Sequence, residues 1–133
     1  MNVNDQRLNA YARLIVEVGS NVQPDVPVLI TGAIEVADFV RLVVKYAYEA
    51  GASEVVVDWQ DDALSRLRLE NASLDVLDNV PDFLYDKREY YCQKGVHMIH
   101  LISSDPEALA GVDHDRVQRA SMAINKKFKP LRH

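Results

Sequence analysis

The chain has 133 residues, of which 48% are apolar and 26% are charged, and its formal net charge is -5 at pH 7. This length suits one domain with a buried core, and the composition is that of an ordinary globular protein. The negative charge argues against a nucleic-acid-binding domain, because such domains carry a basic face for phosphates.

Three further features concern the cellular compartment. No apolar run approaches the roughly 20 residues that a bilayer-spanning helix needs. The polar amino terminus lacks the apolar segment of a signal peptide. Cys92 is the only cysteine, so neither an intrachain disulfide nor a cysteine-based zinc cluster can form. Together these features predict a cytoplasmic protein that binds neither membranes nor nucleic acid.

A helix is the first element that the sequence predicts. Asn4 or Asp5 is suited to cap it, and Gly19 is expected to end it in a left-handed conformation. Its apolar face follows a helical period and consists of Leu8, Tyr11, Ala12, Ile15 and Val18.

A strand–helix–strand pattern lies between Val26 and Asp62. Residues 28–30 and 55–57 are unbroken apolar runs, typical of strands that are covered on both faces. Residues 34–50 have a helical period, with a predicted apolar stripe of Val36, Ala37, Val40, Val43, Val44, Ala47 and Tyr48. Such a unit implies parallel strands and a right-handed crossover. We therefore predict an α/β fold: a three-layer sandwich whose small, mainly parallel sheet is built on βαβ units.

The second half of the chain alternates short helical patterns with one more strand. The predicted elements are a helix from Asp61 or Asp62 to residue 70, a helical turn at 74–77, a helix from Pro81 to Cys92, a strand at 96–104, a short helix at 107–110 and a helix from Asp113 to Pro130. The last helix is expected to bury Val117, Ala120, Ile124 and Phe128. No linker or repeat interrupts the pattern, so residues 1–133 are predicted to form a single domain.

Gly32 lies where the first strand is expected to turn into its helix, the place of phosphate loops in nucleotide-binding folds. A phosphate loop needs several glycines, and this turn has one, with no Walker lysine. The alternative is a simple left-handed turn, which the single glycine favours.

Two histidines and the cysteine are candidates for other chemistry. His97 and His100 lie three residues apart in a predicted strand, so they should point to opposite faces and cannot share one metal ion. Two separate histidines are the favoured interpretation. Cys92 has no histidine partner nearby in its helix, and we expect a small, half-buried packing residue.

The acidic group Asp58, Asp61 and Asp62 surrounds Trp59 at the carboxyl end of a predicted strand. Open α/β sheets bind ligands at this edge, where Thr31 and residues 103–105 are also expected. A polar lip of a ligand cleft is one interpretation, with Trp59, Asp61 and Asp62 as its residues. The other is helix capping, because aspartate is a preferred first residue of a helix. No nucleophile–base pair or metal-ligand spacing is visible, so neither catalytic nor metal-binding residues are predicted.

The segments "EAGASEVVVDWQDD" (49–62) and "SDPEALAGVD" (104–113) carry a resemblance that extends over almost the whole chain. The sequence resembles the amino-terminal part of the metal-dependent aminopeptidases of the thermophilic type, the aminopeptidase S, aminopeptidase T and PepS family. The resemblance implies a cytoplasmic, homodimeric exopeptidase that removes amino-terminal residues from peptides. It also implies a two-metal site with cobalt, zinc or magnesium, in which the ions activate a water and polarise the scissile carbonyl.

Family members are considerably longer, and their metal ligands lie in the carboxy-terminal portion. No residue of this chain matches one of those ligands. The resemblance therefore implies an amino-terminal domain fragment that holds no metal and is inactive alone. The alternatives are a flavodoxin-like domain that binds a small ligand and an interaction module without catalysis.

Overall fold

The computed structural model describes residues 5–102 and 107–131. The chain divides into two compact units, one formed by residues 1–60 and 93–103 and the other by residues 61–92 and 104–133. We call them unit 1 and unit 2 and describe each by itself. The prediction of a single domain is not tested by this division and stays a prediction.

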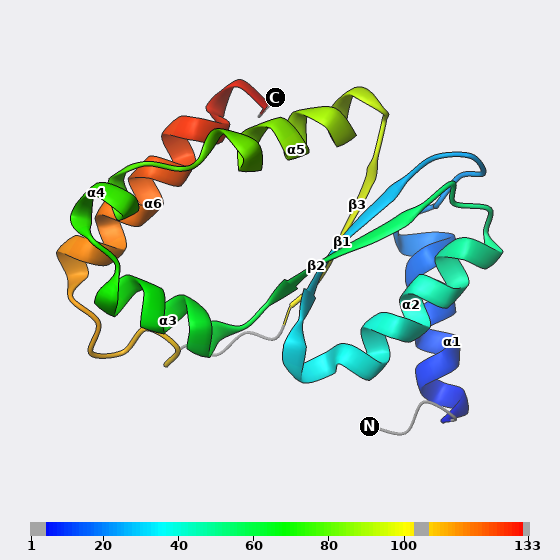
Figure 1. Cartoon of the computed structure of the whole chain (residues 1–133). Helices are drawn as coiled ribbons and strands as arrows, with labels where there is room; N and C mark the ends of the chain where they lie inside the picture. The colour runs from blue at the N-terminus through cyan, green and yellow to red at the C-terminus, as the bar shows by residue number, and fades with distance from the viewer. Residues whose placement is uncertain (1–4, 103–106, 132–133) are drawn as a thin grey trace. The chain divides into compact units, whose positions relative to one another are not determined.

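Unit 1 contains a three-stranded parallel sheet with the order β2-β1-β3 (Figure 1). Its strands are β1 (Val28–Ala33), β2 (Val55–Gln60) and β3 (His97–Leu101). Val28 pairs with Val55 on one side and with His97 on the other, and both registers continue in parallel along the strands. The predicted α/β class with a small parallel sheet is confirmed.

One face of this sheet carries the main core. Side chains alternate between the two faces of a strand, so Val28 and Ile30 of β1 share a face with Ile99 of β3. All three are buried and belong to one apolar cluster with α2 (Ala37–Glu49) and α1 (Gln6–Leu14). These two helices lie side by side over the sheet (Figure 1).

The first helix differs from its prediction at its end. Asp5 caps α1, since its carboxylate accepts a hydrogen bond from the Arg7 amide at 2.8 Å. The chain then continues as a π-helical turn, η1 (Ile15–Gly19), in which Val16 is fully buried and Val18 is 70% exposed. Val18 was wrongly predicted as a core residue, because a π turn has a wider period than the α-helix that the spacing assumed. Gly19 has no positive φ, so the predicted left-handed ending is also wrong.

α2 buries a wider surface than the predicted stripe. A 3₁₀ turn, η2 (Ile34–Val36), precedes it, and Gly51 follows it in the left-handed region with φ 100°, as a helix ending requires. Val40, Val43 and Ala47 of the predicted stripe are buried, and so are Phe39, Leu42 and Tyr46 outside it. The predicted burial of Tyr48 is wrong, because 50% of its surface is exposed. The cause is α1, which covers a second side of α2: Tyr11 stacks on Phe39, and the Tyr46 hydroxyl donates to Asn9 Oδ1 at 2.6 Å.

Gly32 is a residue of β1 and has no positive φ, so both the predicted turn position and the left-handed turn are wrong. A Cβ atom at this position would lie 3.0 Å from Cγ2 and 3.3 Å from Cγ1 of Val40, which is fully buried. The glycine therefore allows α2 to approach the sheet closely.

Gly32→Ala should lower the free energy of unfolding by about 1–3 kcal/mol, because the added methyl group overpacks the contact with Val40. Denaturant unfolding followed by circular dichroism measures this loss. Gly19→Ala is the matched control, since the nearest atom to a Cβ there is the Leu14 carbonyl oxygen at 4.0 Å. Equal stability of the two variants would contradict the packing role of Gly32.

Unit 2 is helical in its described part. Its elements are α3 (Asp62–Asn71), α4 (Leu74–Asp78), α5 (Asp82–Gln93), α6 (His114–Phe128) and the 3₁₀ turn η3 (Lys129–Leu131). α6 packs on α3 and α4. Asp61, Ser73 and Asp113 cap α3, α4 and α6, in agreement with the predicted helix starts.

The apolar core of unit 2 is small. Among its described residues only Leu77 and Ala120 are buried apolar side chains. The predicted burial of Ile124 is wrong, because 44% of this side chain is exposed, and Cys92 is exposed instead of half-buried. Residues 107–111 form turns and not the predicted helix. Residues 103–106, predicted as a strand end and a helix cap, lie outside the described residues.

Candidate functional site

The carboxyl edge of the sheet is where one interpretation of the sequence puts the polar lip of a ligand cleft. β1, β2 and β3 end there at Ala33, Gln60 and Leu101. On the face opposite to α2, the register aligns Thr31 with Asp58 on one side and with His100 on the other. His97 pairs with Val28 and His100 with Thr31, so the two histidines lie on opposite faces, as predicted.

The three predicted lip residues are spread over both units. Trp59 is a β2 residue of unit 1 and is 44% exposed. In unit 2, the Asp61 carboxylate accepts hydrogen bonds from the amides of Ala63 at 3.0 Å and Leu64 at 3.3 Å. Asp62 is the first residue of α3. The capping interpretation is thus confirmed for Asp61, and a lip formed by all three residues stays a prediction.

An apolar groove of about 340 Å³ lies within unit 1, near the end of β3. The sequence did not predict it, because its walls come from three segments that are far apart in the chain. The groove is lined by Leu8, Tyr11, Ile15, Val36, Phe39, His100, Leu101 and Ile102. The groove suits an apolar side chain or an apolar segment of chain.

The metal implied by the resemblance has no matching donor set in the described residues. Within residues 5–102 and 107–131, no three His, Cys, Asp or Glu side chains come together in a way that holds a metal ion. His114 opens α6, and His133 lies outside the described part.

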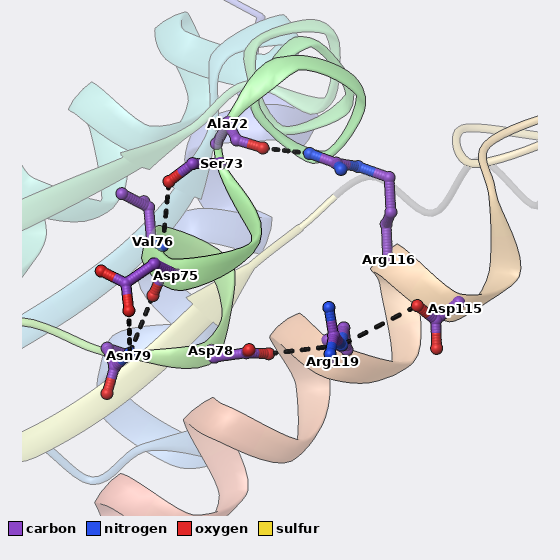
Figure 2. A network of polar contacts seen from close by, with 9 residues as sticks. All are labelled: Ala72, Ser73, Asp75, Val76, Asp78, Asn79, Asp115, Arg116 and Arg119. Carbon is purple, nitrogen blue, oxygen red and sulfur yellow. Dashed lines mark hydrogen bonds and ion pairs between the residues drawn. The ribbon is translucent and has the colours of Figure 1, made fainter.

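A network of polar contacts in unit 2 fixes the ends of α3 and α4 (Figure 2). The Arg116 guanidinium of α6 donates from Nε to the Leu69 carbonyl at 2.6 Å and from a second nitrogen to the Ala72 carbonyl. These carbonyls lie at the carboxyl end of α3, where backbone acceptors lack helical partners. Arg119 lies 3.6 Å from Asp78 and 3.8 Å from Asp115.

Arg116→Lys should lower the free energy of unfolding by about 1–3 kcal/mol. The reason is that a lysine ammonium lacks the planar group of donors with which the guanidinium binds the carbonyls of Leu69 and Ala72 at the same time. Thermal and denaturant unfolding measure the loss. Arg119→Lys is the control and should cost less than about 1 kcal/mol, since Arg119 makes only partly exposed ion pairs. A larger loss for Arg119→Lys would contradict this assignment.

α5 and α6 are joined by an exposed ion pair between Asp82 and Lys127. The hydrogen bond and the positive charge of Lys127 hold the pKa of the Asp82 carboxyl below its ordinary value. The nearby Tyr85 has a raised pKa, first because of desolvation and then because of the Glu89 carboxylate. The shift of Asp82 thus comes from the contact between α5 and α6.

No helix in the described part of the chain is both long and apolar enough to cross a bilayer.

Comparison with known proteins identifies the family. The sequence profile described as thermophilic metalloprotease (M29) matches residues 4–133. The chain is 39% identical to aminopeptidase AmpS of Bacillus subtilis over 99% of this chain and 32% of that protein. It is 35% identical to aminopeptidase T of Thermus thermophilus over 98% of this chain and 32% of that protein.

A solved structure agrees with these matches. Wild-type AmpT from Thermus thermophilus superimposes with a TM-score of 0.86 at 36% identity, covering 94% of this chain and 32% of that chain. The chain thus spans about one third of the length of the relatives that it matches. On the evidence of the profile, the relatives and the fold, this chain belongs to the thermophilic metalloprotease family M29.

Proposed function

We propose that this chain forms the amino-terminal part of a metallo-aminopeptidase that releases amino-terminal residues from peptides. The observation that carries the proposal is the match to named aminopeptidases over 98–99% of this chain but only 32% of their length. A family with metalloprotease activity needs a metal site, and the described residues provide no cluster of three ligands. We therefore place the two-metal site, with cobalt, zinc or magnesium, in sequence that this chain does not span.

The proposed role of this part is structural support for the catalytic portion. Unit 1 provides a packed sheet, and unit 2 exposes several large apolar side chains in its described part: Leu64, Leu67, Phe83, Tyr90 and Met122. Large apolar side chains that are exposed in one part of a protein are available for contacts with another part or with a partner. This supports the proposal that further chain or a second subunit covers unit 2. We also propose a cytoplasmic homodimer.

An activity assay on the protein made from the complete reading frame tests the proposal. We expect release of amino-terminal residues from a peptide when cobalt, zinc or magnesium is added, and loss of activity after chelation. The 133-residue chain should show no activity with any of these ions. A longer protein that is inactive with all three metals, or a stop codon directly after His133, would contradict the proposal.

Metal titration of the 133-residue chain is an independent test. We expect no saturable binding of cobalt or zinc by calorimetry, because the ligands are placed elsewhere. Stoichiometric binding to this chain would show that the metal site is misplaced in the proposal.

Among the proposed lip residues, Trp59 offers an indole surface that is 44% exposed. Asp61 is already used as a helix cap, so its replacement would also disturb α3. In the longer protein, Trp59→Ala is therefore expected to raise KM for peptides about tenfold and to leave kcat unchanged. A tenfold rise corresponds to the loss of roughly one apolar contact with the substrate. An unchanged KM would remove Trp59 from the proposed lip.

A further inference from the structure

Among the described residues of unit 1, no strand pairs with the outer edge of β3. β3 is the last strand on its side of the sheet, and its described partner is β1. The His97 amide donates to the Pro27 carbonyl at 2.9 Å, so the backbone groups of His97, Ile99 and Leu101 face β1. Backbone groups alternate along a strand, so those of Met98 and His100 face the outer side. An unpaired strand edge is a template for a further strand.

The two edges of the sheet differ in how they are protected. On the β2 side, the Glu54 carbonyl faces β1, because it accepts a hydrogen bond from the Val28 amide at 2.9 Å. Backbone groups alternate in direction along a strand, so those of Val55 face away from β1, towards the outer edge of β2. The Tyr48 hydroxyl accepts a hydrogen bond from this Val55 amide at 3.1 Å and thereby occupies the start of that edge. At β3, the carboxyl end of the strand instead borders the apolar groove, which His100, Leu101 and Ile102 help to line.

The groove provides the side-chain contacts that a further strand needs. Its opposite wall consists of Leu8, Tyr11 and Ile15 in the α1–η1 segment. Tyr11 is 58% exposed and Ile102 is 59% exposed, so apolar surface remains uncovered on both walls. A strand paired with β3 would lie about 4.8 Å from it and would direct every second side chain towards the helix side of the sheet. Apolar side chains of such a strand would cover this surface.

The topology indicates where the strand comes from. The order β2-β1-β3 is the beginning of the doubly wound order 2-1-3-4-5, in which a fourth parallel strand adds beside β3. A parallel crossover needs a dozen or more residues, and residues 102–131, which include α6, exceed this length. The relatives are about three times as long as this chain, so they contain sequence that can provide the strand.

We propose that the outer edge of β3 and the groove beside it accept a fourth parallel strand, an apolar segment from the part of the family chain that this sequence does not span. The inference rests on the proposed function for the existence of that part. The backbone groups of Met98 and His100 would pair with this strand, which would run parallel to β3. Strands in such sheets are covered on both faces, so the segment is expected to be rich in valine and isoleucine.

Amide hydrogen exchange tests the proposal in two proteins, the 133-residue chain and the protein made from the complete reading frame. In the longer protein, exchange of the Met98 and His100 amides should be slower by about a hundredfold or more. The Trp59 amide, on the outer edge of β2, is the internal control and should change much less. Equal exchange of Met98 and His100 in both proteins would overturn the proposal. Slow exchange of both amides in the 133-residue chain would also overturn it, because the edge would already be covered.

A groove variant adds a second measurement. Ile102→Asp should lower Tm of the longer protein by several degrees and leave Tm of the 133-residue chain unchanged, because Ile102 is covered only when the fourth strand is present. Val18→Asp is the matched control; Val18 is 70% exposed and does not line the groove, so it should have little effect in either protein. Equal effects of Ile102→Asp in both proteins would contradict the proposal.

These measurements do not depend on peptidase activity. Protected amides in an inactive longer protein would contradict the proposed function and support the fourth strand. Unprotected amides in an active protein would contradict the fourth strand alone. If the chain pairs with a second copy instead, protection in the 133-residue chain will rise with protein concentration, and this result would also overturn the proposal.

Discussion

Ile30→Ala should lower the free energy of unfolding by about 2–5 kcal/mol, one of the two largest losses expected in this chain. Ile30 is fully buried in the middle of β1, the central strand of the sheet. It belongs to the cluster that joins the sheet to α2 through Val40 and Val43. Removing three carbon atoms there leaves a cavity that the surrounding strands can fill only partly. A loss of this size is a large share of the 5–15 kcal/mol typical of a whole domain.

The fluorescence of Trp59 measures this effect, because the chain contains one tryptophan and that residue lies in β2, next to β1. Denaturant unfolding followed by fluorescence therefore reports on unit 1. Ile102→Ala makes the same chemical change at a site that is 59% exposed, and it should cost no more than about 0.5–1 kcal/mol. If both variants lose the same stability, the assignment of Ile30 to the core is wrong.

The strands and the βαβ unit could be predicted because their signals are local. Unbroken apolar runs mark β1 and β2, and Gly51 has the positive φ that is typical after a helix. The order of the strands was not predicted, since a single crossover does not say on which side of β1 the third strand pairs. Gly32 shows a second limit. A glycine after an apolar run suggests a turn, but here the strand continues through it and the missing Cβ makes room for Val40.

The candidate site was harder to predict for the same physical reason. The groove combines α1, the start of α2 and the end of β3, so each wall looks like an ordinary amphipathic element in the sequence. One signal was present: Phe39 is a large aromatic residue outside the predicted stripe of α2, and Tyr11 of α1 stacks on it with ring centroids 5.6 Å apart. The role of Arg116 had no local signal, because its acceptors lie 44 and 47 residues away along the chain.

Leu77→Ala should also cost about 2–5 kcal/mol, but in unit 2. The Leu77 side chain is 1% exposed and lies in α4, which packs on α6. Because unit 2 has so few buried apolar side chains in its described part, the loss of this one removes a large share of its core. Far-UV circular dichroism should show unfolding of helices at lower denaturant concentration. Leu67→Ala in α3, where the side chain is 56% exposed, is the matched control and should have a much smaller effect.

The same pair of variants decides whether the two units behave as one domain. If residues 1–133 form the predicted single cooperative domain, Leu77→Ala will shift the fluorescence of Trp59 and the circular dichroism by the same amount, although Trp59 lies in unit 1. If the units unfold independently, Leu77→Ala will shift the helical signal and leave the fluorescence transition in place. Ile30→Ala would then shift the fluorescence transition of Trp59 and leave the unfolding of the unit 2 helices in place. Independent unfolding would contradict the single-domain prediction. It would also fit unit 2 as a helical module that depends on further chain for its stability, because its apolar side chains are exposed in this structure.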